Sequence, residues 1–484
     1  MKKHFKNILT LVCCTIVFTA CDREKLNPVP ETFVAEATAF DNVVRIENAL
    51  RGVYGTLKNG SLYGGRVVVY GDIRGEDFIN ETGNLVTASD VWQHIPTNSA
   101  SAVERTWTQA YLTINAANVF IEGMEAKGTS IVGQTLSNNY VAEVRLIRAL
   151  AYHILVQYYA RPYADGNGSR PGVPLRLTAI KGPGQSSAPR ATVAQVYNQI
   201  IEDLNFAEQN LPSTYPNATL NVTRAHKNTA IALKTRVYLT MQRYADVITE
   251  ANKIVPQAPP FVATSGVPHA MQADPVTPFR TFTTTESIFS MPMTTTAGDF
   301  PGTQNQLAFY FYNNGSVGSA EYSLNPNGII ANQNWGPNDR RRQFIFTNPA
   351  NNKRFLSKWV TAGQYTDWVP VIRWPEVLLN LAEALARTTT GVNSRALLLV
   401  NAVRQRSDAS VTIVAATQQQ LIDAIMLERR IEFLGEGIRT MDILRLLQPF
   451  PAKGGAPAKN PGDVGYIWPI PASELNLNPQ MTDN

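Results

Sequence analysis

Cysteine is nearly absent from this sequence, and so are long apolar runs. The three cysteines are Cys13, Cys14 and Cys21, all close to the N-terminus. If the chain is cut before Cys21, one cysteine remains, which leaves no internal disulfide and no thiolate metal site. No apolar run reaches the roughly 20 residues that a membrane-spanning helix needs. These absences exclude a disulfide-stapled scaffold and a membrane-spanning protein.

A strong excess of one charge is also lacking. Without the three lysines of the first six residues, the formal net charge falls from +5 to +2. This near-neutrality argues against a nucleic-acid partner, which would require a basic stripe. The sequence contains no HExxH, GxSxG, P-loop or GxGxxG motif, and its five histidines are isolated. We therefore predict no metal, no cofactor and no enzyme activity. A glycan hydrolase, which needs only two carboxylates, stays open as an alternative.

The N-terminus has the pattern of an export signal. Lys2, Lys3 and Lys6 precede an almost wholly apolar stretch, residues 8–18, that is too short to span a bilayer. The stretch ends in Phe-Thr-Ala-Cys, which has the small residues of a lipobox just before Cys21. We predict a lipoprotein signal peptide over residues 1–20, and a lipidated Cys21 with a polar tether over 21–38. Lipoprotein cysteines carry more than one acyl chain, which anchors a protein stably.

Apolar residues repeat at helical spacing on both sides of a loop-rich middle. In residues 39–255 the helices come in antiparallel pairs, as in tetratricopeptide-like arrays, and Thr192 is a predicted N-cap. Residues 256–371 are dense in Pro, Gly, Asn, Thr and aromatics and fit no long helix, so we predict a candidate ligand-binding region there. Helices resume in residues 372–484. The predicted helices span about 39–57, 103–121, 137–159, 193–211, 224–242, 244–255, 372–387, 394–406 and 418–447.

The last of these helices carries carboxylates one turn apart, which share a face. Unpaired carboxylates there would repel one another, so a structural network with nearby arginines is favoured over a catalytic site. The predicted network consists of Glu428, Glu432, Glu436, Arg404, Arg406 and Arg439. Gly435 and Gly437 destabilise a helix and suggest a close approach to a neighbouring helix.

Several loops combine aromatic side chains with amides and acids. Trp or Tyr offers a flat apolar platform for the C–H face of a sugar ring, and the polar neighbours can bond the hydroxyls. We predict Trp107 and Trp374, on helices, to be core residues. The predicted ligand-binding residues, with Trp92 and Trp335 first, are Trp92, Trp335, Tyr310, Tyr312, Asn313, Asp72 and Asn338.

Four segments in a fixed order carry a family resemblance. Residues 424–445, "AIMLERRIEFLGEGIRTMDILR", resemble the ER…E…EG.R..D..R helix of the SusD/RagB family of outer-membrane nutrient-binding lipoproteins. Residues 401–406 resemble the family's N.VR.R helix, and residues 373–384 its R..E..L..AEA helix. Residues 469–484 are similar to its PIP..E...NP...QN ending, with Asp483 in place of the usual Gln.

The resemblance implies a mainly all-α fold, with tetratricopeptide-like repeats packed against a loop-rich region with a few short strands. It also implies a partner, a SusC-like TonB-dependent transporter over which the lipoprotein acts as a lid. The implied cargo is an oligosaccharide first and, as in RagB-like uptake subunits, a peptide second. A purely structural subunit without a ligand of its own is a further alternative. Asp22 and Glu24 resemble the family's surface-export signal, so we expect the protein to be anchored at the outer face of the outer membrane.

Overall fold

The computed structural model describes residues 38–182, 187–296, 299–316, 318–361, 363–364 and 366–484. The predicted signal peptide, the lipidated Cys21 and the tether up to residue 37 lie outside the described residues. Helices dominate and strands are short, which confirms the mainly α-helical class with helical repeats.

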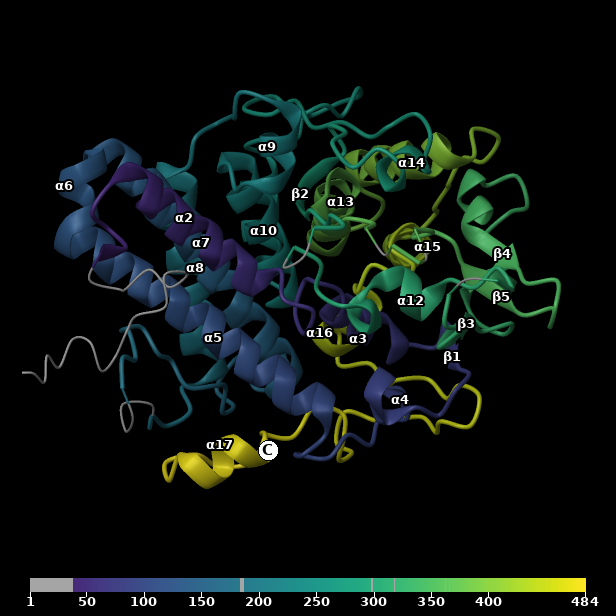
Figure 1. Ribbon diagram of the computed structural model, residues 1–484. Helices are drawn as coiled ribbons and strands as arrows, with labels where there is room; N and C mark the ends of the chain where they lie inside the picture. Colours follow the sequence, from purple (N-terminus) through teal and green to yellow (C-terminus); the bar gives the residue numbers. More distant parts are fainter. Residues whose placement is uncertain (1–37, 183–186, 297–298, 317, 362, 365) are drawn as a thin grey trace, which may run out of the picture.

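The N-terminal half is a stack of helices in which each packs on the next (Figure 1). Its members agree with the predicted helices to within a few residues, because the apolar stripes that predicted them are the faces they bury. In order of packing they are α2 (Val43–Leu57), α5 (Ser101–Gly123), α7 (Gln134–Tyr159), α8 (Val193–Asn210), α10 (Lys227–Thr240) and α11 (Tyr244–Ala251).

Helix α8 shows how local sequence starts such a helix. The Thr192 hydroxyl accepts from the backbone N–H of Gln195 at 3.2 Å, and the Gln195 side-chain oxygen accepts from the backbone N–H of Thr192 at 2.8 Å. This reciprocal capping box satisfies two N–H groups at the helix start. It confirms Thr192 as the N-cap.

The stack continues into the C-terminal part, so the loop-rich middle lies beside it and does not interrupt it. Helix α11 packs on α13, and α13 packs on both α14 and α15. Trp374, at the start of α13, and Trp107 are both buried, as predicted. The remaining long helices are α13 (Trp374–Thr388), α14 (Ser394–Ser407) and α15 (Gln418–Glu432). Shorter ones are α3 (Arg66–Ile73), α16 (Arg439–Arg445) and α17 (Ala472–Leu477).

Three antiparallel strand pairs hold the irregular segments together. They are β1 (Phe78–Asn80) with β3 (Tyr322–Leu324), β2 (Ser287–Met291) with β6 (Val369–Arg373), and β4 (Ile345–Thr347) with β5 (Arg354–Leu356). Short helical turns complete the chain: η2 (Leu85–Thr87), α4 (Ser89–Trp92), η3 (Met124–Gly128), α6 (Thr129–Val132), α9 (Ala218–Thr223), η4 (Thr277–Phe279), η5 (Thr303–Asn305), α12 (Leu307–Phe311), η6 (Ile329–Ala331) and η7 (Arg340–Phe344).

The predicted single helix over 418–447 is wrong. The helix that begins at Gln418, α15, ends at Glu432, and α16 begins only at Arg439. Gly435 and Gly437 between them adopt φ of +83° and +82°, the left-handed region that ends a helix. The expected close approach is present at the same place, since a Cβ on Gly71 of α3 would lie 2.3 Å from the Gly437 carbonyl oxygen.

Replacing Gly437 by alanine is expected to destabilise the protein more than replacing Gly391. Both glycines have left-handed φ, which costs an alanine about 1–2 kcal/mol. A Cβ at Gly437 would also stand 3.0 Å from the Val68 Cα, whereas Gly391 has nothing within 4 Å. We expect the crowding to add roughly 1–3 kcal/mol. Urea unfolding followed by circular dichroism measures both losses, and equal losses would contradict the tight contact.

Candidate functional site

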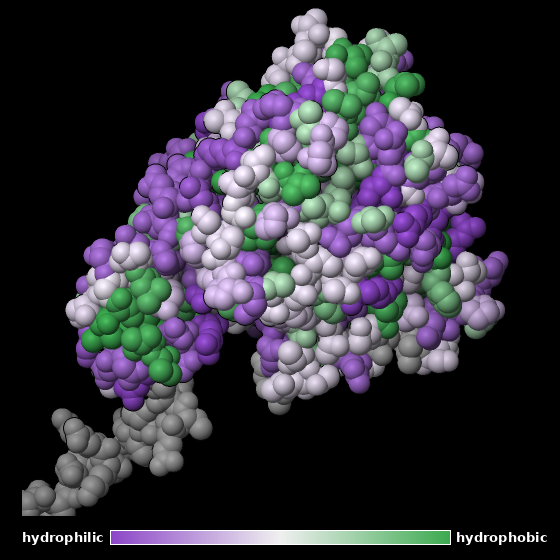
Figure 2. All heavy atoms as spheres, turned by 90° about the horizontal axis from the view of Figure 1, so that it is seen from above, coloured by the Kyte–Doolittle hydropathy of each residue, from purple (hydrophilic) through white to green (hydrophobic). Residues whose placement is uncertain are grey.

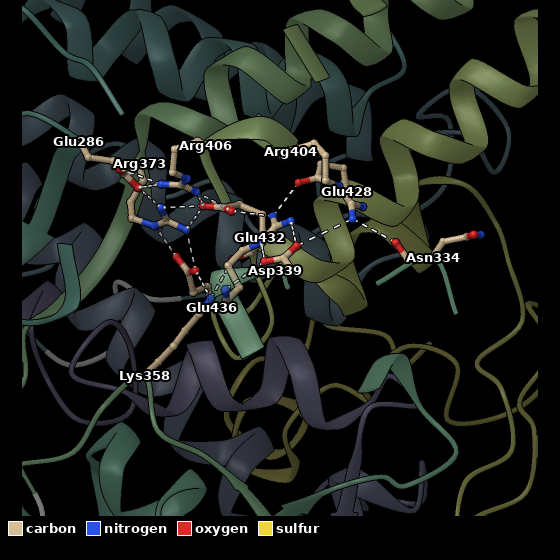
Figure 3. Close-up of polar contacts among 11 residues, drawn as sticks. Glu286, Asn334, Asp339, Lys358, Arg373, Arg404, Arg406, Glu428, Glu432 and Glu436 are labelled. Carbon is tan, nitrogen blue, oxygen red and sulfur yellow. Dashed lines mark hydrogen bonds and ion pairs between the residues drawn. The ribbon is translucent and has the colours of Figure 1, made fainter. Parts of the chain in front are cut away.

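A buried network of ion pairs lies where α14, α15 and the loop-rich middle meet (Figure 3). Its centre is Glu432, whose carboxylate accepts from Arg406 at 2.7 Å, Arg341 at 3.0 Å and Arg373 at 3.1 Å. Glu428 accepts from Arg404 at 2.6 Å. Acidic and basic members are equal in number, and no side chain among them is more than 5% exposed: Glu286, Asp339, Glu428, Glu432 and Glu436 with Arg341, Lys358, Arg373, Arg404 and Arg406.

The central carboxylate of this network is unsuited to acid–base catalysis near neutral pH. Burial would raise the pKa of Glu432, but the charges of Arg406 and Arg373 outweigh burial and hold the pKa well below its usual value. General acids and bases work best with a pKa near the working pH. The cavity that reaches Glu436 measures about 50 Å³, far below the size of a ligand pocket. The arrangement therefore favours a structural role.

Arg439 was predicted to belong to this network, and that prediction is wrong. Its guanidinium bonds both oxygens of Glu76, at 2.7 and 3.0 Å, on the segment after α3. The reason is the break after Glu432, which turns α16 away from the helix face that the prediction assumed. Glu436 lies in the same break and is placed by Lys358 and Arg373 instead.

A second buried cluster joins α13, α15 and α16. Arg445 bonds Glu383 at 2.6 Å and Asp442 at 2.8 Å, and Arg429 bonds Asp442 at 3.2 Å. Burial would raise the pKa of Asp442, but Arg429 and Arg445 outweigh burial and lower the pKa to about 2. Motif residues of the C-terminal segment thus tie three helices together.

Acidification is expected to destabilise the protein below about pH 4. Asp442 has a folded pKa below its unfolded value, so its stabilisation is complete above that value and is lost as the pH falls toward 2. The full contribution is roughly 2–3 kcal/mol. Thermal unfolding between pH 5 and pH 2 measures it. Asp442→Asn should be less stable at pH 5 and show a flatter dependence below pH 4; an unchanged slope would contradict the assignment.

Four of the predicted ligand residues are buried, so their assignment as surface contacts is wrong. The Trp92 indole donates to the Phe78 carbonyl at 2.8 Å, and Trp335 is covered by the Arg342 guanidinium 4.7 Å from its ring centre. Tyr310 is 0% exposed and donates to the Gln304 carbonyl at 2.9 Å. Asp72 accepts from the Gly437 backbone, and burial raises its pKa well above the usual value. These side chains pack the loops against α3 and the C-terminal segment.

The other three predicted residues are accessible. Tyr312 is half-buried, with its ring centre 6.0 Å from that of Phe346. Asn313 lies beside it and accepts a 2.9 Å hydrogen bond from the Asn348 side chain. Asn338 is exposed on a different turn, between the buried Trp335 and Asp339.

Tyr312 and Asn313 belong to a surface built by three loops, residues 80–87, 312–321 and 346–354, which we call the loop face. Glu321 joins two of the loops by accepting from Thr82 at 2.6 Å and Thr87 at 2.5 Å. An ion pair between Glu81 and Lys353 joins the third. The strands that carry these loops, β1, β3, β4 and β5, lie together at the right of Figure 1.

A second half-buried aromatic pair lies on other loops of this region and was not predicted. Phe282 and Trp368 stack with their ring centres 5.4 Å apart and their planes at 13°. Partial desolvation lowers the pKa of the nearby Arg280, and Asp367, next to Trp368 in sequence, and Tyr312 oppose that shift. No short motif could have revealed this pair, because its two halves lie on loops 86 residues apart.

The fold and the loop face define an α-helical repeat protein with a large loop-rich region. Two family profiles match the chain: "SusD family" over residues 303–484, and "Starch-binding associating with outer membrane" over residues 35–239. A SusD superfamily protein from Bacteroides fragilis is 32% identical, with a TM-score of 0.81 over 92% of this chain and 99% of that one. The chain belongs to the SusD family.

Two more distant relatives are similar over nearly the whole chain. SusD-like protein P25 of Formosa agariphila is 23% identical over 99% of this chain and 98% of its own length. A solved "Laminarin binding SusD-like protein" is 20% identical, with a TM-score of 0.72 over 92% of this chain and 99% of that one. The family description places its members at the outer membrane. Within the described ranges, no helix combines the length and the apolarity needed to cross a membrane.

Proposed function

We propose that this protein is a lipid-anchored binding protein of the outer-membrane surface, which captures an oligosaccharide and passes it to a SusC-like TonB-dependent transporter. The family's starch-binding description and the laminarin-binding relative support a glycan as cargo. The anchor would be the lipidated Cys21, and the lipobox before it supports that assignment.

One observation carries the binding assignment: the half-buried pair Tyr312–Phe346 stands beside the Asn313 amide on the loop face, and a second such pair lies on other loops. Tyr312–Phe346 and Phe282–Trp368 offer apolar ring surfaces on which the C–H faces of sugars can pack. The side chains of asparagines provide both donors and acceptors for hydroxyls. Arg280 adds a guanidinium; three of its bonds go to the carbonyls of residues 279, 357 and 358, which fix its position.

Affinity electrophoresis of the purified protein in gels with laminarin, starch or other polysaccharides tests this function. Retardation in at least one gel, with micromolar or tighter binding by calorimetry, is the expected result. Binding to a peptide array with no retardation in any gel would replace the oligosaccharide by a peptide. Release of reducing sugar would instead show a hydrolase. Co-purification with a transporter, but with no ligand in either screen, would leave a structural subunit.

A further inference from the structure

A small apolar patch lies at the end of the molecule where the described chain begins. Val43 and Val44, in the first turn of α2, are 41% and 67% exposed, and Ile131 of α6 is 39% exposed. Figure 2 shows a compact hydrophobic patch at this end of the molecule. Aliphatic side chains gathered in this way have a reason only if something covers them.

Internal contacts join the segments that carry these residues. Tyr140 of α7 donates to Glu47 of α2 at 3.0 Å, which places the starts of α2 and α7 together. Phe40 packs on Phe120, and its ring fills the space over Gly123. An ion pair between Asp41 and Lys127 ties the approach to α2 to the turn before α6. The patch is therefore a rigid surface of packed helices.

The position of the patch identifies what covers it. The described chain starts at Thr38, five residues before Val43, and the predicted lipidated Cys21 lies 17 residues before Thr38. Seventeen residues span at most about 60 Å, so an anchored protein keeps this end within reach of the bilayer. Asp41 pairs with both Arg45 and Lys127, which leaves this group of three side chains with a net charge of +1 beside the patch.

We propose that this patch is a membrane-contact surface, whose partner is the lipid bilayer to which the protein is anchored. The inference rests on the lipid anchor of the proposed function. A patch of a few aliphatic side chains binds a membrane weakly by itself, but the anchor makes its contact intramolecular and raises its effective concentration. The patch would set the orientation of the protein, so that the helical end rests on the membrane and the loop face lies away from this contact.

Site-specific fluorescence on the anchored protein tests this proposal. The sequence has no cysteine after Cys21, whose sulfur is blocked by a thioether bond to the lipid in the lipoprotein, so one introduced cysteine can be labelled alone. Val44→Cys carries the environment-sensitive dye NBD in the patch. Val414→Cys, 82% exposed before α15, is the matched control. The full lipoprotein is reconstituted into phosphatidylethanolamine–phosphatidylglycerol vesicles and compared with the same protein in detergent-free buffer after delipidation.

The expected result is a blue shift and a several-fold rise of NBD emission at position 44 on vesicles, with no change at position 414. Ile131→Asp in the Val44→Cys background should reduce the shift, while flotation with vesicles persists. Flotation without a shift at position 44, or an equal shift at both positions, would overturn the membrane contact and leave the anchor in place. A protein that does not float would refute the anchor, and the contact with it.

Discussion

Replacing Glu432 by glutamine is expected to lower the free energy of unfolding by about 3–5 kcal/mol, because it leaves buried guanidinium groups without their counter-charge. Glu432 is the carboxylate on which Arg341, Arg373 and Arg406 converge, and all four side chains are buried. Glutamine keeps the shape, removes the charge and replaces one accepting oxygen by an NH2 group that can only donate. Urea unfolding monitored by circular dichroism measures the loss.

Glu202→Gln is the matched control for this experiment. Glu202 also pairs with an arginine, Arg145 at 3.2 Å, but its side chain is 69% exposed. Water screens such a pair, so the loss should stay below about 1 kcal/mol. Folded Glu432→Gln protein should bind glycan like the wild type, because Glu432 bonds Arg341, Arg373 and Arg406 and not the loop-face aromatics. Lost binding at unchanged stability would contradict the structural role.

Replacing both Trp368 and Tyr312 by alanine is expected to weaken glycan binding at least tenfold, and each single replacement less. Truncating a well-placed aromatic contact commonly costs about 2 kcal/mol or more, which corresponds to roughly thirtyfold in affinity. The two residues belong to the two half-buried aromatic pairs that we propose as platforms for the sugar. Calorimetry with the polysaccharide that retards the wild type most measures the loss.

Tyr244→Ala controls for the general effect of removing a half-buried aromatic. Tyr244 is half-buried on α11, where Arg387 lies 5.6 Å from its ring centre, in the helical stack and not on the loop face. Its loss should leave glycan affinity unchanged. If the double variant bound like the wild type while Tyr244→Ala also did, the loop face would not be the ligand site.

The helical part of the fold was accessible from the sequence because helices bury regular stripes. The pattern Val196, Ile200, Leu204 and Ala207 gave α8 to within one residue, and Thr192 marked its start. At Gly435 and Gly437, which flank Glu436, the apolar periodicity of the sequence continues but the helix does not. The spacing of apolar side chains does not indicate where the backbone must adopt a positive φ.

The ligand residues were harder to predict, because a loop tryptophan looks the same in sequence whether it faces solvent or the core. Trp92, Trp335 and Trp368 each stand next to a polar residue in the sequence. Of these three tryptophans, Trp368 is half-exposed and the other two are buried. Burial in a loop depends on what segments far along the chain place against it, as Arg342 covers Trp335. The spacing of residues within a loop does not reveal such long-range contacts.

The sequence by itself determined the helical stack, the family and the residue types of the buried C-terminal network, because regular burial and charge pairing leave short-range patterns. Only the tertiary structure decided which carboxylate meets which arginine, where the long C-terminal helix breaks and which aromatics reach the surface. Those outcomes depend on contacts between residues 282 and 368, or 76 and 439, that lie far apart along the chain. Folding brings such distant residues together, and the local sequence around each residue does not show which partner it will meet.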